Sequence, residues 1–152
     1  MKAWVFALAA SMCMAGAAEA RDVRVTLNGV EARGGSLLAA LQTTDQFLKG
    51  PGAYNLGQTA TPGTVTLVFP NVAPGDYAFA LMHDEDGDSQ MKMDANTQMP
   101  LEGWALSNGD ALRGPPTFDA AKFTVPDTGG DVTLTVNMHY PPATAAAAPA
   151  TH

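Results

Sequence analysis

The segment VTLTVNMHY, residues 132–140, decides the fold class because apolar and polar side chains alternate along its whole length. The apolar positions are Val132, Leu134, Val136, Met138 and Tyr140. A period of two places one set of side chains on each face of an extended strand, as in a sheet with one buried face. The segment therefore predicts a β-strand that covers a hydrophobic core.

The same alternation occurs in three more segments. They are DVRVTL at residues 22–27, TVTLVF at 64–69 and YAFAL at 77–81, the last after a Pro-Gly turn. Several short strands at this spacing favour an antiparallel sandwich over a helical or βαβ design. We therefore expect an all-β protein: a single antiparallel β-sandwich, prealbumin- or immunoglobulin-like, with about seven strands and one long loop.

Two segments are harder to interpret. In SLLAALQTTDQFL, residues 36–48, Leu37 and Leu41 have helical spacing, but Leu37, Ala39 and Leu41 also alternate as in a strand. Periodicity alone leaves both readings open. AAKFTV, residues 120–125, is a short strand candidate. The long gap between strands that begins at Asp84 is expected to be functional or partly structured.

The N-terminal residues 1–20 have the layout of a secretory signal peptide, with an early lysine, an apolar middle and small residues Ala18 and Ala20 at the end. The single cysteine, Cys13, falls within this segment, so the mature chain is expected to contain no thiol. We predict a β-sandwich domain at residues 21–140 and a disordered, low-complexity tail at 141–152. The protein is expected to be exported, periplasmic or extracellular.

The formal net charge of -7 bears on the class of partner. Removal of the predicted signal peptide takes away Lys2 and Glu19, one charge of each sign, and leaves the net charge unchanged. Nucleic acid requires clustered lysine and arginine, so it is excluded as an expected partner. A cation or a neutral partner fits better, such as a cell-envelope protein or a glycan. No transmembrane segment is expected in the mature chain.

An acidic cluster follows the predicted strand at residues 77–81, in the stretch MHDEDGDSQMKMD. Asp84, Asp86 and Asp88 stand at alternate positions, and Gly87 permits a sharp turn between them. Calcium binds six to eight hard oxygen atoms, so we predict a structural Ca²⁺ site, closed by Asp94 from the far side. The alternative is a solvated turn, since aspartate and glycine are common in exposed loops.

Two further residues are candidates for this site. Asn96 could add an oxygen ligand, and His83 shares the parity of the inward residues of its strand. His83 is therefore expected at the inner edge of the sheet, where it would order the loop or ligate a softer metal.

Copper is an alternative cofactor. Five methionines lie near His83 and His139 in the sequence: Met82, Met91, Met93, Met99 and Met138. Thioether and imidazole ligands suit Cu(I) in an exported protein without thiols, which would make the chain a periplasmic copper carrier. Methionine is also an ordinary filler of hydrophobic cores, which is the competing interpretation.

A candidate ligand surface lies in LEGWALSNGDALRGPPTFD, residues 101–119. Trp104 and Phe118 could form an apolar platform for a sugar or peptide, with a polar rim from Glu102, Asn108 and Arg113. The structural alternative is that both aromatic residues cap the core and that Arg113 pairs with a carboxylate. No serine has a nucleophile-elbow context, so we do not expect an enzyme.

Four motifs, in order, carry a family resemblance: PGDYAFALMHDEDGD at residues 74–88, then Asp94-Ala95-Asn96, then PLEGWALSN, and finally GPPTFDAAKFTV ending at Val125. This order resembles a family of secreted bacterial proteins, domain-of-unknown-function family 2141. The resemblance implies a prealbumin-like β-sandwich outside the cytoplasm. It implies no established activity.

Overall fold

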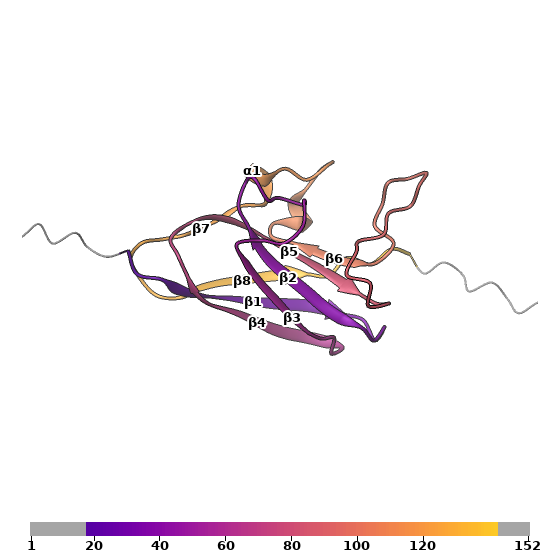
Figure 1. Cartoon of the computed structure of the whole chain (residues 1–152), viewed down its shortest axis with the longest axis horizontal. Coiled ribbons are helices and arrows are strands. Elements are labelled where there is room, and N and C mark those ends of the chain that lie inside the picture. Colours follow the sequence, from indigo (N-terminus) through magenta and orange to yellow (C-terminus); the bar gives the residue numbers. More distant parts are fainter. Residues whose placement is uncertain (1–17, 143–152) are drawn as a thin grey trace, which may run out of the picture.

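The computed structural model describes residues 18–142 and forms a sandwich of two β-sheets (Figure 1). Its strands are β1 (Arg21–Val30), β2 (Ser36–Gln42), β3 (Tyr54–Thr59), β4 (Gly63–Val72), β5 (Gly75–Asp84), β6 (Gly103–Leu106), β7 (Phe123–Val125) and β8 (Val132–Asn137). The described helices are short: the 3-10 helix η1 (Gly109–Ala111) and the α-helix α1 (Phe118–Ala121). The predicted all-β sandwich is confirmed.

The first sheet has the strand order β4-β1-β8, and the second has the order β3-β2-β5-β6. β7 pairs with the beginning of β5, next to the stretch where β6 pairs with its end. One pairing differs from the antiparallel expectation, because β1 and β8 run parallel. These two strands come from opposite ends of the domain, so no short turn constrains their relative direction.

The core lies between the sheets and is built from the alternating positions of the sequence. Phe69 of β4 and Phe79 of β5 meet across it, edge to face, with ring centroids 6.2 Å apart. In β1, the inward residues Val23, Val25 and Leu27 are fully buried. Burial of aliphatic and aromatic side chains contributes about 1.5–3 kcal/mol each, so this core is the main source of stability.

The ambiguous segment at residues 36–48 is a strand as far as Gln42 and a turn beyond it. β2 pairs with β3 on one side and with β5 on the other, which makes it a central strand. Inter-strand hydrogen bonds on both sides override its helical spacing. The candidate strand at 120–125 is shorter than predicted, because residues up to Ala121 belong to α1.

Two predicted segments lie largely outside the described residues. The predicted signal peptide, residues 1–20, is described only from residue 18, and the predicted tail, residues 141–152, only to residue 142. Within residues 18–142, no helix is long and apolar enough to cross a membrane.

Candidate metal centre

The acidic turn begins at the end of β5, where Asp84 is almost fully buried. Its two carboxylate oxygens accept hydrogen bonds from the backbone N–H of Gly87, at 2.9 Å, and of Ser89, at 3.0 Å. The chain can fold back around this carboxylate because Gly87 and Ser89 both adopt positive φ angles, of 80° and 59°. Asp84 therefore anchors the turn from the inside.

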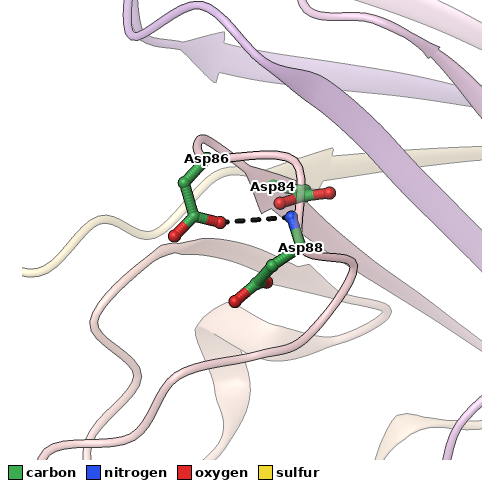
Figure 2. Close-up of side chains that lie close together, drawn as sticks. All are labelled: Asp84, Asp86 and Asp88. Atoms are coloured by element: carbon green, nitrogen blue, oxygen red, sulfur yellow. Dashed lines mark hydrogen bonds between the residues drawn. The ribbon is translucent and has the colours of Figure 1, made fainter.

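The turn brings three of the four predicted metal ligands together. One carboxylate oxygen each of Asp84, Asp86 and Asp88 lie within 4.8 Å of one another, a spacing that one cation can bridge. Figure 2 shows the three side chains around the turn, with the backbone N–H of Asp88 directed at Asp86, 3.3 Å from its Oδ1. Asp88 in turn accepts a hydrogen bond from the N–H of Gln90 at 2.9 Å. The alternate spacing of the aspartates thus produces a convergent set of oxygens.

The fourth predicted ligand, Asp94, is not among the described carboxylates that converge there. It lies in the hairpin that rises from the end of the sandwich beside β6 (Figure 1). Its Oδ1 accepts hydrogen bonds from the N–H of Asn96, at 3.0 Å, and from the N–H and hydroxyl of Thr97, at 2.7 and 3.0 Å. The backbone hydrogen bond from Thr97 lowers the pKa of Asp94 below its ordinary value. Asp94 and Asn96 therefore close their own turn.

Lys92, which the sequence reasoning did not consider, lies against the acidic cluster. Its ammonium group forms an ion pair with Asp86 and lies 3.1 Å from a carboxylate oxygen of Asp88. All three side chains are partly exposed, so solvent screens these pairs. The spacing of four between Asp88 and Lys92 signals a contact only on a helix, and residues 85–92 are not helical, so the sequence carried no local signal for this ion pair.

Glu102 is a second residue at the cluster that the sequence reasoning placed elsewhere. The predicted ligand-surface rim would leave it exposed, but only 5% of Glu102 is exposed. The β5–β6 ladder pairs His83 with Gly103, so Glu102 follows one step further, beside Asp84. Its Oε1 accepts a long hydrogen bond of 3.4 Å from the N–H of Glu85, and its buried Oε2 has no hydrogen-bond partner within residues 18–142.

An unpartnered buried carboxylate oxygen is costly, because an ionised group loses its hydration without compensation. The carboxylate of Glu102 contacts the backbone of Glu85, and Glu85 lies between Asp84 and Asp86 in the sequence. The oxygens of Glu102 are not among those that converge in the cluster, so a cation bound by the aspartates would offset this cost at longer range or through a bound water molecule. No local pattern reveals the contact, since it depends on the register of two strands far apart in sequence.

His83 is fully buried and braces the strand end beneath the cluster. Its Nε2 lies 2.6 Å from the carbonyl oxygen of Gly34, which can only accept, so Nε2 carries the hydrogen. Its Nδ1 lies 2.7 Å from the hydroxyl of Tyr140, which donates to it and accepts from the N–H of Glu31. Both ring nitrogens are engaged in this arrangement. His83 therefore orders the segment around the loop and has no nitrogen left to ligate a metal.

Arg33 extends this brace toward the acidic turn. Its guanidinium lies 4.6 Å from the ring centroid of Tyr140 and forms ion pairs with Glu31, at 2.6 Å, and Glu85, at 3.3 Å. The hydrogen bond to Glu31 raises the pKa of Arg33. Glu85, which lies between Asp84 and Asp86, is thus paired outward and leaves the aspartates to face one another.

Residues 25–133 match the family described as "Uncharacterized protein conserved in bacteria (DUF2141)". The chain belongs to this family. The match extends beyond the four motifs noted in the sequence and includes most of both sheets. No curated protein and no solved structure matches the chain.

In this DUF2141 chain the two aromatic residues of the predicted ligand surface pack into the framework. Trp104 stacks on His139, with ring centroids 4.5 Å apart and an interplanar angle of 22°. Phe118 packs edge-on against Phe47, at 5.9 Å. Both lie at the border of a small buried cluster of Ala78, Leu106 and Ala121. This packing favours the interpretation of Trp104 and Phe118 as caps of the core.

The polar residues predicted for the same surface bind backbone carbonyls. The side-chain amide of Asn108 donates to the carbonyls of Ala120 and Lys122, at 3.2 and 3.3 Å, and so ties down α1. Arg113 donates to the carbonyls of Asp110 and Leu112, at 3.0 and 2.9 Å, rather than pairing with a carboxylate. The predicted ion pair of Arg113 is replaced by these local contacts. The side-chain donors of Asn108 and Arg113 are thus used in contacts within the protein, and neither is oriented by these contacts for binding a sugar or peptide.

The methionines proposed for copper come from three parts of the chain: Met82 from β5, Met91, Met93 and Met99 from the segment between β5 and β6, and Met138 from the residues after β8, where it packs against the core. Met93 pairs with Pro100 across the hairpin, and the N–H of Asp94 donates to the carbonyl of Met99 at 2.8 Å. Met93 and Met99 are both exposed. Because both nitrogens of His83 are hydrogen-bonded, this histidine is not available to join them as a ligand of a soft metal.

Proposed function

We propose that this DUF2141 protein is an exported, non-enzymatic binding or structural protein whose acidic loop is ordered by a bound calcium ion. One observation carries the proposal: one carboxylate oxygen each of Asp84, Asp86 and Asp88 lie within 4.8 Å of one another at the end of β5. Carboxylates held this close repel one another, and a divalent cation would offset the repulsion that remains beside the single charge of Lys92.

The donor set favours a hard divalent cation. The candidate ligands are all carboxylate oxygens, and calcium takes six to eight oxygens at roughly 2.3–2.6 Å, with backbone carbonyls and water completing its shell. Zinc and copper prefer nitrogen or sulfur ligands, and both nitrogens of the nearby His83 are engaged. Calcium is therefore the cation that we assign to this turn.

The proposed role of the ion is structural. The acidic turn lies at the base of the segment that joins β5 to β6, and a cation there would fix the start of this segment against the sandwich. Sites of this exposed kind bind calcium with dissociation constants of ~10⁻⁴ to 10⁻³ M, which suits a compartment outside the cytoplasm. The pattern of the first twenty residues supports export in the same way.

Two observations support a role without catalysis. Ser107 is buried, and its hydroxyl donates to the carbonyl of Ala121 at 2.5 Å, so it is not placed as a nucleophile. Asp84 is committed to holding the turn by two backbone hydrogen bonds, which suits a ligand more than an exchanging acid or base.

Calorimetric titration of the purified protein with calcium tests the proposal. We expect one ion per chain and, at calcium tenfold above the dissociation constant, about 1.4 kcal/mol of added stability, seen as a rise of several degrees in Tm. The double variant Asp86→Asn/Asp88→Asn should lose both effects. Asp127→Asn removes an exposed carboxylate between β7 and β8 and should keep them. Absence of heat and of a Tm shift at millimolar calcium would remove the proposed function.

A further inference from the structure

Lys92 is the one lysine or arginine of residues 18–142 that contacts the three-aspartate cluster. Its ammonium pairs simultaneously with Asp86 and Asp88, two of the three carboxylates that converge in the candidate site. Its backbone carbonyl accepts a hydrogen bond from Leu101 at 2.8 Å, so the base of the hairpin holds the side chain in reach of the cluster. The protein thus supplies its own monovalent cation to the candidate site.

This single positive charge does not neutralise the cluster. Three aspartates against one ammonium leave two negative charges in excess. The carboxylate of Glu102 is held at the backbone of Glu85, inside the acidic turn, with its buried Oε2 unpartnered among the described residues. The oxygens of Glu102 are not among those that converge in the cluster, so this unsatisfied oxygen indicates an unmet need for a positive group or a water molecule at the border of the acidic turn.

We propose that Lys92 is the specificity-determining residue of the cation site: a tethered monovalent competitor that calcium displaces and that sodium and potassium do not. The inference rests on the proposed calcium-binding function. A monovalent ion offers the aspartates no more charge than the ammonium, which is present at a high effective concentration because it is covalently attached. Calcium brings two charges and coordinates several oxygens at once, so it gains where a monovalent ion does not.

Removal of the competitor should strengthen calcium binding. We expect Lys92→Gln to bind calcium about tenfold more tightly than the wild-type protein in calorimetric titration, because calcium no longer displaces a positive charge from its own ligands. Lys92→Arg keeps the charge and should bind within a factor of about three of the wild-type protein. Lys49→Gln is the matched control: it makes the same change in net charge at an exposed lysine in the turn after β2, and its affinity should not change.

A second experiment tests selectivity by measuring the calcium affinity in two salts at equal ionic strength. Sodium is small enough to enter the site, whereas tetramethylammonium screens charge but is too large to be coordinated. For the wild-type protein, the calcium affinity should be equal in the two chlorides, because Lys92 already excludes monovalent ions. For Lys92→Gln, sodium chloride should weaken calcium binding several-fold more than tetramethylammonium chloride does.

The outcomes separate the two proposals. If the wild-type protein binds calcium but Lys92→Gln binds no more tightly than Lys49→Gln, or shows no difference between the salts, Lys92 does not determine specificity, while the calcium site stands. If neither the wild-type protein nor Lys92→Gln binds calcium, the proposed function itself fails. Lys92 is exposed, so its replacement is not expected to prevent folding, and the Tm of each variant in chelator checks this.

Discussion

Replacement of Asp84 by alanine should destabilise the protein even in the absence of metal. The buried carboxylate holds the acidic turn through hydrogen bonds of 2.9 Å from Gly87 and 3.0 Å from Ser89. Each hydrogen bond to an ionised acceptor contributes about 1.5–3 kcal/mol, so loss of both sets an upper range of about 3–6 kcal/mol. Since the two freed N–H groups lie in an exposed turn and can bind water, we expect a loss of about 2–3 kcal/mol.

Urea denaturation in the presence of a chelator measures this loss. The midpoint should fall while the m value stays unchanged, because the same core is exposed on unfolding. Asp84→Asn keeps one acceptor oxygen and should lose about half as much. The control, Asp127→Ala, changes an exposed residue and should stay within about 0.5 kcal/mol of the wild-type protein. An Asp84→Ala variant as stable as this control would refute the view that Asp84 anchors the turn.

Three further predictions concern the surroundings of the site. Tyr140→Phe leaves a nitrogen of buried His83 without its donor and should lower the free energy of unfolding by about 1–3 kcal/mol in urea denaturation. Burial also raises the pKa of Tyr140 above its ordinary value of 10.0, so wild-type stability should fall as the pH rises through the folded-state pKa, and a pH series should show a smaller alkaline loss for Tyr140→Phe. The pKa of Asp94 is lowered from its ordinary value of 3.8, so the ionised carboxylate stabilises the fold at pH values above 3.8, and this contribution is lost as the pH falls through the folded-state pKa. Asp94→Asn should therefore make Tm fall less steeply at acidic pH than in the wild-type protein, and an unchanged slope would contradict this. Gly103→Ala would place a Cβ 2.2 Å from a ring carbon of Tyr140, and we expect a loss of about 1–3 kcal/mol by the same urea assay, whereas wild-type stability would show that the ring moves freely.

The strands that sequence patterns predicted are those in which apolar residues alternate: β1, β4, β5 and β8. The core confirms their inward positions, and β5 is buried on its other face as well, at Ala78. β3 escaped prediction because it is an edge strand with polar residues and glycine between half-buried side chains. The parallel pairing of β1 with β8 escaped for another reason: it is a contact between chain ends, and local periodicity carries no information on it.

In the candidate site, the features that depend on local sequence could also be predicted, and those that depend on distant residues could not. The convergence of Asp84, Asp86 and Asp88 follows from alternate spacing and a glycine turn, both of which are local. The position of Glu102 depends on the register between β5 and β6, and the contact of His83 with Tyr140 joins residues 57 positions apart in the sequence. Distance in sequence does not explain every departure, because Asp94 and Arg113 bind groups within three residues of themselves and not the partners that were predicted.

A structure determined in millimolar calcium tests the central claim most directly. We predict one ion at the acidic turn, at roughly 2.3–2.6 Å from carboxylate oxygens of Asp84, Asp86 and Asp88, with the ammonium of Lys92 moved away. Glu102 should face the ion or a water molecule bound to it. A well-ordered turn without an ion, with Lys92 still paired to Asp86 and Asp88, would contradict the claim.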